Sequence, residues 1–267
     1  MSKIMINYRN KIALVTGASS GIGKEYSKEL AAKGSDLILV ARSKDKLEVL
    51  ANELRTTYGV NSYFLVSDLS KPGAAIEVAD KVKALGLNVD ILINNAGFGS
   101  HGKFQEDSMD QYRQMVELNI TSVMDMTAQF LPYMQHKQEG IIVNVSSFLA
   151  FYPFPYMGVY AATKAFVLSF SESLWAENRH LGIRVLALCP GATKTGFFDV
   201  VGTSDMPGGV TGTPQSVVRT AFRGLERNRT YVVDGIKNYL IANSSRFVTR
   251  KFMAVLSERL GRSSLNE

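Results

Sequence analysis

The sequence predicts an α/β fold, a doubly wound parallel sheet with helices on both faces. Short, almost continuous apolar runs alternate along the chain with longer segments of helical spacing. Such runs are typical of strands buried on both faces, and strands separated by helices pair in parallel through right-handed crossovers. The expected strands are 11–16, 36–41, 62–67, 89–93, 140–145, 183–188 and 230–234. The expected helices are 22–33, 44–58, 73–86, 108–137, 158–181 and 214–227.

Seven strands in 267 residues fit one domain, which we expect over residues 1–235. The glycine-rich stretch 196–213 follows neither a strand nor a helix period, and its length makes it a candidate lid over a site. Residues 236–267 are expected to form a basic, amphipathic helical extension packed on the same domain, beside the lid or against another subunit. The alternative is that this helix lies on an anionic membrane.

Composition and charge exclude several classes of protein. The chain is 46% hydrophobic and 20% charged, which is ordinary for a soluble enzyme. Its charge of +6 is mostly local, since six basic and two acidic residues give the stretch 236–267 a charge of +4, and this pattern does not favour nucleic-acid binding. We expect no membrane span, no signal peptide and a cytoplasmic location, with Cys189 as a buried structural thiol.

The stretch "TGASSGIG" stands between the first expected strand and the first expected helix. Glycines there let the backbone turn tightly and approach a pyrophosphate, while the helix N-terminus offers unpaired N–H groups to its charge. The sequence therefore predicts a dinucleotide site at this turn. Its expected contacts are Gly17, Ser19, Ser20, Gly21, Ile22 and Gly23.

Tyr160 and Lys164 lie four residues apart in an expected helix, so their side chains project from one face. Two interpretations are open. The pair is either a surface contact with a snorkelling lysine, or a proton donor beside a cation that lowers its pKa.

Six motifs in order resemble those of the short-chain dehydrogenase/reductase family and decide between these interpretations. The glycine turn matches T-G-x-x-x-G-x-G, and N-N-A-G is present at residues 94–97. The family's catalytic asparagine matches Asn119, and its serine, thirteen residues before the tyrosine, matches Ser147. Tyr160 and Lys164 match Y-x-x-x-K, and "PGATKT" matches P-G-x-x-x-T. The matches run from residue 12 to about 195.

The resemblance implies a Rossmann-type fold and hydride transfer between a nicotinamide cofactor and a carbonyl or alcohol carbon. Tyr160 would be the acid and base, with its pKa moved toward neutrality by Lys164 beside the positive charge of an oxidised nicotinamide, and Lys164 would also grip the nicotinamide ribose. Ser147 would stabilise charge on the substrate oxygen, and Asn119 would kink its helix and hold a water linked to Lys164. Taken singly, Ser147 is equally a hydroxyl that caps a turn, and Asn119 a helix residue with local hydrogen bonds.

NADP(H) is favoured over NAD(H) as the cofactor. NAD-specific sites place an acid at the end of the second strand, where this sequence has Arg42 and Ser43, and a guanidinium beside a hydroxyl suits a 2′-phosphate. Alternatively, Arg42 is an ordinary exposed side chain, and Ser70 caps the next helix. By resemblance, the other cofactor contacts are Asp68, Leu69, Asn95, Ala96, Gly97, Tyr160, Lys164, Pro190, Gly191, Thr193 and Thr195.

Aromatic residues surround the expected site, and they favour an apolar carbonyl or alcohol substrate, lipid-like, steroid-like or aryl. Core or subunit contacts are the alternative for each ring. The expected pocket residues are Phe98, Phe148, Phe154, Phe197 and Phe198, with Phe151 and Tyr156 in the same wall.

No metal is expected, because His101, His136 and His180 stand far apart in the sequence, although His101 is close enough to N-N-A-G to line the site. A homodimer or homotetramer through 108–137 and 158–181 is implied by the family. The alternatives to an enzyme are a non-catalytic NADPH-binding sensor or scaffold, and a peripheral membrane protein that acts through the tail.

Overall fold

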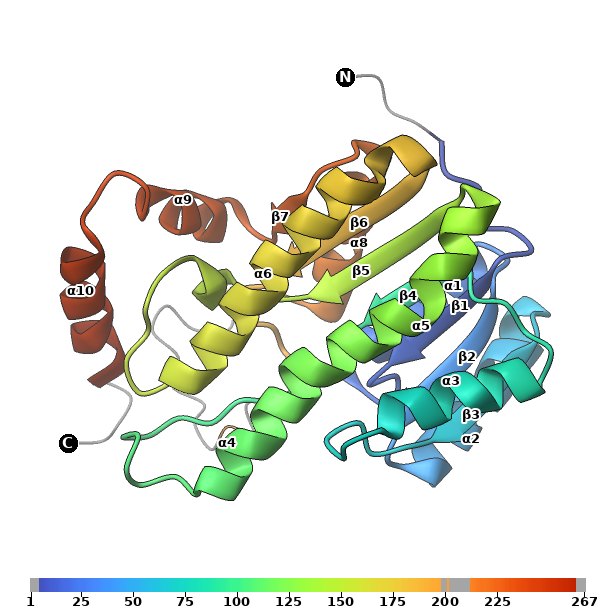
Figure 1. Cartoon of the computed structure of the whole chain (residues 1–267), viewed down its shortest axis with the longest axis horizontal. Helices are drawn as coiled ribbons and strands as arrows, with labels where there is room; N and C mark the ends of the chain where they lie inside the picture. The colour runs from blue at the N-terminus through green and yellow to red at the C-terminus, as the bar shows by residue number, and fades with distance from the viewer. Residues whose placement is uncertain (1–4, 198–200, 202–211, 263–267) are drawn as a thin grey trace.

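A seven-stranded parallel sheet in the order β3-β2-β1-β4-β5-β6-β7 forms the centre of the protein (Figure 1). The computed structural model describes residues 5–197, 201 and 212–262. The predicted doubly wound α/β fold is confirmed. The strands are β1 (Ile12–Thr16), β2 (Asp36–Ala41), β3 (Ser62–Val66), β4 (Ile91–Asn94), β5 (Gly140–Val145), β6 (Ile183–Cys189) and β7 (Tyr231–Val233).

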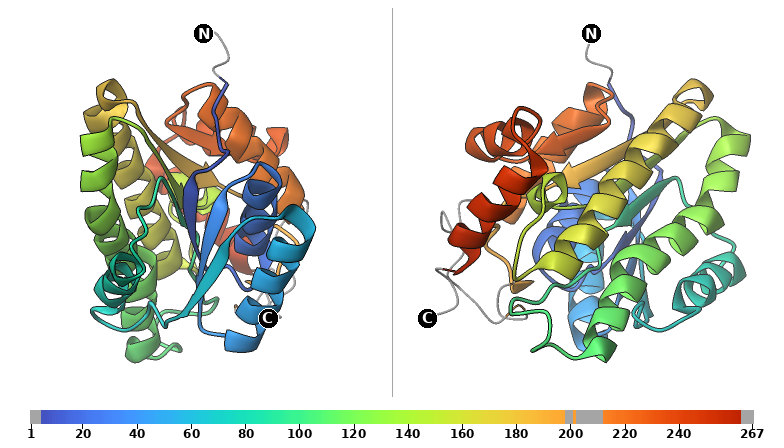
Figure 2. Two further views of the ribbon diagram at one scale, coloured as in Figure 1. Left: turned by 90° about the vertical axis from the view of Figure 1, so that its right-hand side faces the viewer. Right: turned by 60° about the vertical axis from the view of Figure 1, so that its left-hand side comes forward.

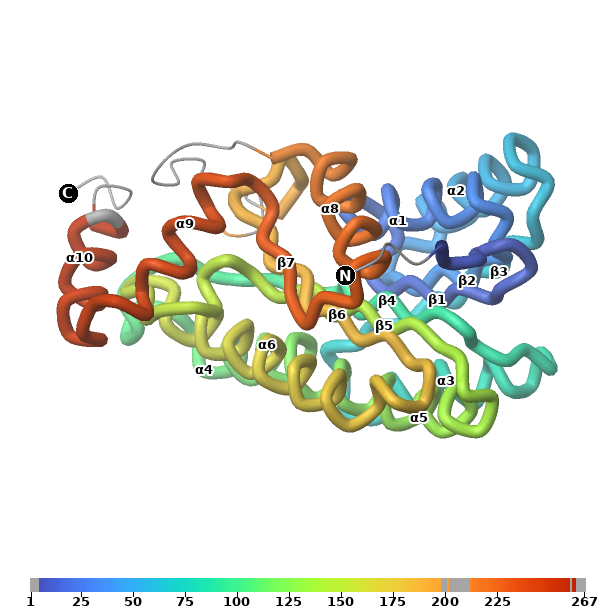
Figure 3. Tube along the Cα trace, turned by 90° about the horizontal axis from the view of Figure 1, so that it is seen from above, coloured from blue at the N-terminus to red at the C-terminus, as the bar shows by residue number. Residues whose placement is uncertain are grey.

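Helices cover both faces of the sheet, as the views from the edge and from above show (Figures 2 and 3). Side chains alternate along each strand, so Ala13 and Val15 of β1 join the core on one face while Leu14 joins the core on the other. This explains the continuous apolar runs in the sequence. One face carries α1 (Gly21–Ala32), α2 (Lys44–Tyr58) and α8 (Pro214–Glu226). The opposite face carries α3 (Ala74–Ala84), α5 (Ser122–Lys137) and α6 (Gly158–Asn178).

The segment expected as one helix over 108–137 is divided by a wider turn. It begins with α4 (Met109–Val116), passes through a π-helical turn (Glu117–Thr121) and continues as α5. Asn119 lies in that turn with its side chain fully buried. Inserted π turns frequently mark functional sites, so this irregularity directs attention to Asn119.

The C-terminal extension consists of two helices rather than the single helix that was expected. α9 (Ile236–Ser244) and α10 (Arg250–Arg262) lie together at one end of the molecule, on the side to which β5 points (Figures 1 and 3). Most of the predicted lid, 196–213, is outside the described residues. Within the described ranges, no helix is both long and apolar enough to cross a bilayer.

Candidate active site

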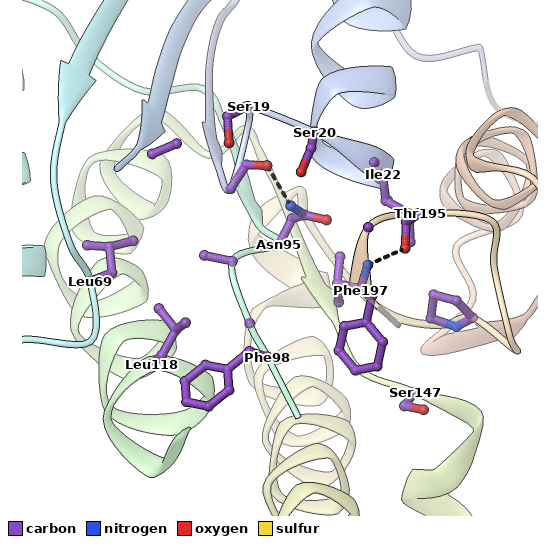
Figure 4. A pocket seen from close by; sticks show the side chains of 18 of the residues that line it. Ser19, Ser20, Ile22, Leu69, Asn95, Phe98, Leu118, Ser147, Thr195 and Phe197 are labelled. Atoms are coloured by element: carbon purple, nitrogen blue, oxygen red, sulfur yellow. Dashed lines mark hydrogen bonds between the residues drawn. The ribbon is translucent and has the colours of Figure 1, made fainter. Parts of the chain in front are cut away.

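A cavity of about 830 Å³ opens at the carboxyl ends of the strands (Figure 4). In open α/β sheets this edge is where ligands bind. The glycine turn and the loops after β2, β3, β4, β5 and β6 all contribute to its wall. Lining residues predicted as cofactor contacts are Gly17, Ser19, Ser20, Gly21, Ile22, Arg42, Ser43, Asp68, Leu69, Asn95, Ala96, Gly97, Tyr160, Lys164, Pro190, Gly191, Thr193 and Thr195.

The glycine turn needs glycine for two separate reasons. Gly17 has φ of +64°, a left-handed conformation that favours a residue without a Cβ atom. Gly23 is not in the lining of the cavity, but a Cβ atom there would collide with the Gly17 carbonyl oxygen and would lie 2.5 Å from Asn95 Nδ2. Gly23 therefore shapes the turn and lets α1 approach it.

Asn95 fixes the glycine turn from the neighbouring strand. Its Nδ2 atom donates to the carbonyl oxygens of Thr16, at 2.9 Å, and Gly17, at 3.3 Å. The Thr16 hydroxyl in turn accepts the N–H groups of Asn95 and Ala96, at 2.9 and 3.0 Å. The first motif and N-N-A-G thus form one hydrogen-bonded unit, in which the Asn95 amide binds the protein backbone.

Positive charge gathers at the end of the cavity beside β2. Arg42 and Lys46 are exposed cations that line it, and Ser43 precedes the first residue of α2. Burial tends to raise the pKa of the Asp68 carboxyl, but hydrogen bonds from Ser70 and the charges of Arg42 and Lys71 hold it below the ordinary value. The alternative interpretation of Ser70 as a helix cap is wrong, because Gly73 occupies that position and Ser70 bonds to Asp68 at 2.7 Å.

Ser147, Tyr160 and Lys164 meet at the inner end of the cavity, from the end of β5 and the first turns of α6. All three are buried, with exposed fractions of 7%, 7% and 4%. Lys164 Nζ lies 5.7 Å from the centre of the Tyr160 ring and donates to the Val145 carbonyl oxygen at 2.9 Å. The surface-pair interpretation of Tyr160 and Lys164 therefore does not fit the structure.

Burial controls the pKa values of these groups. It raises the pKa of Tyr160 to about 12, although a hydrogen bond with the Ser147 side chain opposes the rise. It lowers the pKa of Lys164 to about 8. In the protein alone burial therefore sets the direction of the Tyr160 shift, and the expected lowering of this pKa by Lys164 beside an oxidised nicotinamide stays a prediction. Cys189 is also buried, and burial raises the pKa of its thiol to about 12, so the thiol stays neutral.

Asn119 lies behind the cavity, outside its lining. Its Nδ2 atom donates to the Phe98 carbonyl oxygen at 2.9 Å and to the Thr163 hydroxyl at 3.0 Å, and its Oδ1 atom accepts the Phe98 N–H at 3.2 Å. The side chain therefore ties the loop after β4 to α6, the helix that carries Tyr160. The water expected on Asn119 stays a prediction.

The cavity has an apolar side next to Tyr160. Phe98, Phe148 and Phe197 line it as predicted, and the rings of Phe197 and Tyr160 are 5.5 Å apart. The prediction for Phe154 is wrong, since it is buried in the adjacent apolar cluster and absent from the lining. Phe198 lies outside the described residues.

Two other aromatic side chains of the expected wall also point elsewhere. Phe151 contacts Tyr231 of β7, at 5.4 Å between ring centres, and Tyr156 donates to Glu258 of α10 at 3.3 Å. Neither lines the cavity. His101 likewise bonds to the backbone at Gly261, and burial lowers the pKa of its imidazole. No group of three metal-binding side chains occurs in the part of the chain that the structure describes.

Sequence reasoning missed several residues of the lining. Lys46 lies in the first turn of α2, shortly after Arg42 and Ser43, and Met157 directly precedes α6, so their closeness to predicted contacts was the only signal in the sequence for either. Gln111, Gln114 and Leu118 come from α4 and the π turn, where no motif marks them. Further unpredicted lining residues are Val40, Ala41, Ser67, Ser70, Val145, Ser146, Leu149, Ala192 and Gly196.

Known proteins resemble this chain in sequence and structure. Residues 11–204 match the family model described as short chain dehydrogenase. A very-long-chain 3-oxoacyl-CoA reductase from Anas platyrhynchos is 38% identical over 217 residues, covering 79% of this chain and 67% of the relative. A 17-beta-hydroxysteroid dehydrogenase type 3 from Homo sapiens is 34% identical over 209 residues, covering 76% of this chain and 66% of the relative.

A solved structure of a short-chain dehydrogenase from Sphingobium yanoikuyae in complex with NADPH superposes with a TM-score of 0.81. It is 33% identical in sequence, and the match covers 89% of this chain and 94% of the other. The chain spans about two thirds of the length of the two curated relatives, and nearly all of this solved one.

Proposed function

This chain belongs to the short-chain dehydrogenase family, and we propose that it is an NADP(H)-dependent oxidoreductase that interconverts a carbonyl and an alcohol on an apolar substrate. The resemblance predicted from the motifs is confirmed by the family match. One observation carries the proposal. Ser147, Tyr160 and Lys164 converge at one point of the cavity. The cations Arg42 and Lys46 line the end of the cavity beside β2, and the side next to Tyr160 is apolar.

The lining of the cavity fits a dinucleotide phosphate. The glycine turn, which also carries two serines, lines the cavity directly before α1. The unpaired N–H groups at the N-terminus of α1 would bind a pyrophosphate there. Arg42 and Lys46 supply positive charge for a 2′-phosphate, and no carboxylate stands at the end of β2, where an NAD-specific site has one. The NADPH complex of the Sphingobium relative supports the same choice.

Bound NADPH would supply the hydride that adds to the carbonyl carbon, and Tyr160 would supply the proton that the oxygen takes. Because its pKa is raised to about 12, the phenol holds this proton throughout the neutral range. In the reverse direction Tyr160 would accept the alcohol proton, and the nearby Lys164 ammonium would stabilise the tyrosinate.

Ser147 would stabilise charge on the substrate oxygen. Its Oγ atom accepts the Leu149 N–H at 3.2 Å, and its side chain also hydrogen-bonds to Tyr160, so its hydroxyl lies beside the phenol where the substrate oxygen would be held. A hydrogen bond directed at the developing alkoxide is stronger in the transition state than in the ground state, which is what accelerates the reaction. Lys164 uses one of its three N–H bonds on Val145 and retains two for the ribose hydroxyls.

An apolar substrate is supported by Phe98, Phe148, Leu149, Met157 and Phe197 beside Tyr160. Pockets with many apolar side chains and few polar groups favour ligands of the same kind. The two relatives, a very-long-chain 3-oxoacyl-CoA reductase and a 17-beta-hydroxysteroid dehydrogenase, have names that refer to substrates with large apolar parts. The expected homodimer or homotetramer through α5 and α6 stays a prediction.

The test is an absorbance assay of NADPH oxidation against long-chain 3-oxoacyl thioesters, ketosteroids and aryl ketones, repeated with NADH. We expect turnover of at least one of these classes, with a lower KM for NADPH than for NADH. Tight NADPH binding without turnover of any class, in either direction, would contradict the proposal and support a nucleotide sensor.

A further inference from the structure

Exposed apolar side chains are concentrated on the two C-terminal helices. Nine of the eighteen exposed large apolar side chains in the described parts of the chain belong to residues 236–262, although that stretch is only a tenth of the sequence. Phe247 is 88% exposed, Leu240 61% and Phe252 55%, with Val255 and Leu256 beside them on α10. Scattered exposed apolar residues are normal, but a concentration of this kind marks a site of contact.

The inner faces of α9 and α10 already make contacts with the rest of the protein. On α9, Asn238 donates to the Asp234 carbonyl oxygen at 2.8 Å, and Asn243 accepts the Tyr231 hydroxyl at 3.1 Å. On α10, Met253 and Ser257 are buried, and Ser257 donates to the Pro153 carbonyl oxygen at 2.7 Å. The helices therefore have a fixed orientation, and their apolar outer faces are held away from the domain.

Basic residues accompany the apolar ones. Lys237, Arg246, Arg250, Lys251 and Arg259 are all exposed on the same two helices and their connection. The single acidic residue of this stretch, Glu258, pairs with Arg262 at 3.0 Å. The exposed surface thus combines aromatic and aliphatic side chains with a net positive charge.

We propose that the outer surface of α9 and α10 docks on an anionic lipid bilayer. Apolar side chains enter the boundary between headgroups and acyl chains, while lysine and arginine contact the anionic headgroups. A second copy of this chain fits less well, because a two-fold contact would bring two surfaces of the same positive charge together. The surface is carried by a pair of helices that lie on the membrane and do not cross it.

The docking surface lies next to the apolar side of the cavity. Ser257 and Glu258 contact Pro153 and Tyr156, and the same stretch of chain continues to Met157, which lines the cavity. Figure 3 shows α10 at the end of the molecule, with α9 between it and the sheet. Binding to a bilayer would therefore place this side of the cavity near the lipid.

Vesicle co-sedimentation of the full chain tests the proposal without relying on activity. We expect the protein to sediment with vesicles of phosphatidylcholine and phosphatidylserine, and to be released by added salt. Arg250→Gln with Lys251→Gln should weaken binding by roughly 25-fold, at about fivefold for each charge. Phe252→Gln with Leu256→Gln should weaken it by at least about tenfold.

The matched control is Val49→Gln with Ile76→Gln, two exposed apolar residues on α2 and α3, which should bind the vesicles like wild type. Circular dichroism checks that each variant folds. Failure of the wild type to sediment, or equal sedimentation with pure phosphatidylcholine, overturns the proposal. It is also overturned if Phe252→Gln with Leu256→Gln lowers the molar mass in analytical ultracentrifugation while vesicle binding is unchanged, since the surface then joins two copies.

Discussion

The two ends of the cavity are built in different ways. The end with the glycine turn is made of backbone and short polar side chains, joined by Asn95 and Thr16 across neighbouring strands. The end with Tyr160 is bounded by aromatic and aliphatic side chains from loops, and the loop after β5 is held from outside by α10. The end with the glycine turn has to fit the same dinucleotide in every such enzyme. The side chains of the loops at the other end can differ with the substrate while the reaction stays the same.

Replacement of Ser147, which lies beside Tyr160, should have the largest effect. We expect Ser147→Ala to lower kcat/KM for carbonyl reduction by about 100- to 1000-fold, because a donor to the developing alkoxide is lost. NADPH affinity, measured by fluorescence titration, should be unchanged. Ser147→Thr keeps a hydroxyl and should recover part of the rate. Equal loss in both variants would mean that the hydroxyl is not the active group.

Replacement of Arg42 should affect only the glycine-turn end. Arg42→Ala should raise the KM for NADPH by roughly 10- to 100-fold, the value of a charge-assisted hydrogen bond, and leave the KM for NADH and for the carbonyl unchanged. Lys44→Ala removes a neighbouring exposed cation outside the cavity lining and is the control. A parallel rise in both cofactor KM values would argue against a 2′-phosphate site.

The pH profile of carbonyl reduction tests the protonation states of Lys164 and Tyr160 at the end of the cavity with Tyr160. Burial favours neutral Lys164, so its ammonium persists below a pKa of about 8 and is lost above it. Tyr160 keeps its proton over this range because its own pKa is about 12. We therefore expect kcat/KM to be level at neutral pH and to fall about tenfold per unit above pH 8. A profile that stays level to much higher pH would show that the Lys164 charge is not needed.

Replacement of Ser257 should give the smallest effect, confined to the apolar end. Ser257→Ala removes the hydrogen bond to Pro153, so we expect a loss of about 1 kcal/mol in the free energy of unfolding. The KM for the carbonyl should rise a few-fold, with NADPH affinity unchanged. Ser244→Ala, which removes an exposed hydroxyl of α9, is the control. An equal loss of NADPH affinity in Ser257→Ala would mean that the two ends are not independent.

The glycine-turn end was predictable from the sequence because its constraints are local. Gly17 adopts a left-handed backbone conformation, and Asn95 follows directly after β4. Each can therefore be recognised from a short motif in the sequence. Lys46 was missed because it belongs to no motif and only its closeness to Arg42 in the chain marks it. The doubly wound sheet was predictable for a related reason, since strands buried on both faces must be apolar throughout.

The apolar end was less predictable because it depends on packing between distant segments. Phe148 lines the cavity, whereas Phe154, six residues later, packs in an apolar cluster. Because both are phenylalanines, residue type alone does not distinguish the two positions. Burial raises the pKa of Tyr160 in the protein alone, and burial is a property of the whole fold that a short stretch of sequence does not show. The tail has a helical pattern throughout, but the structure divides it into α9 and α10.

The most direct test of the central claim, that Tyr160 is the proton donor of a reductase, compares Tyr160→Phe with Tyr152→Phe. Tyr152 is a half-buried phenol in the same apolar cluster but outside the cavity lining. NADPH oxidation would be followed with a carbonyl that the wild type reduces, together with NADPH binding. We predict that Tyr160→Phe binds NADPH normally and loses at least about 100-fold in kcat, while Tyr152→Phe keeps its activity. Wild-type turnover in Tyr160→Phe would contradict the account.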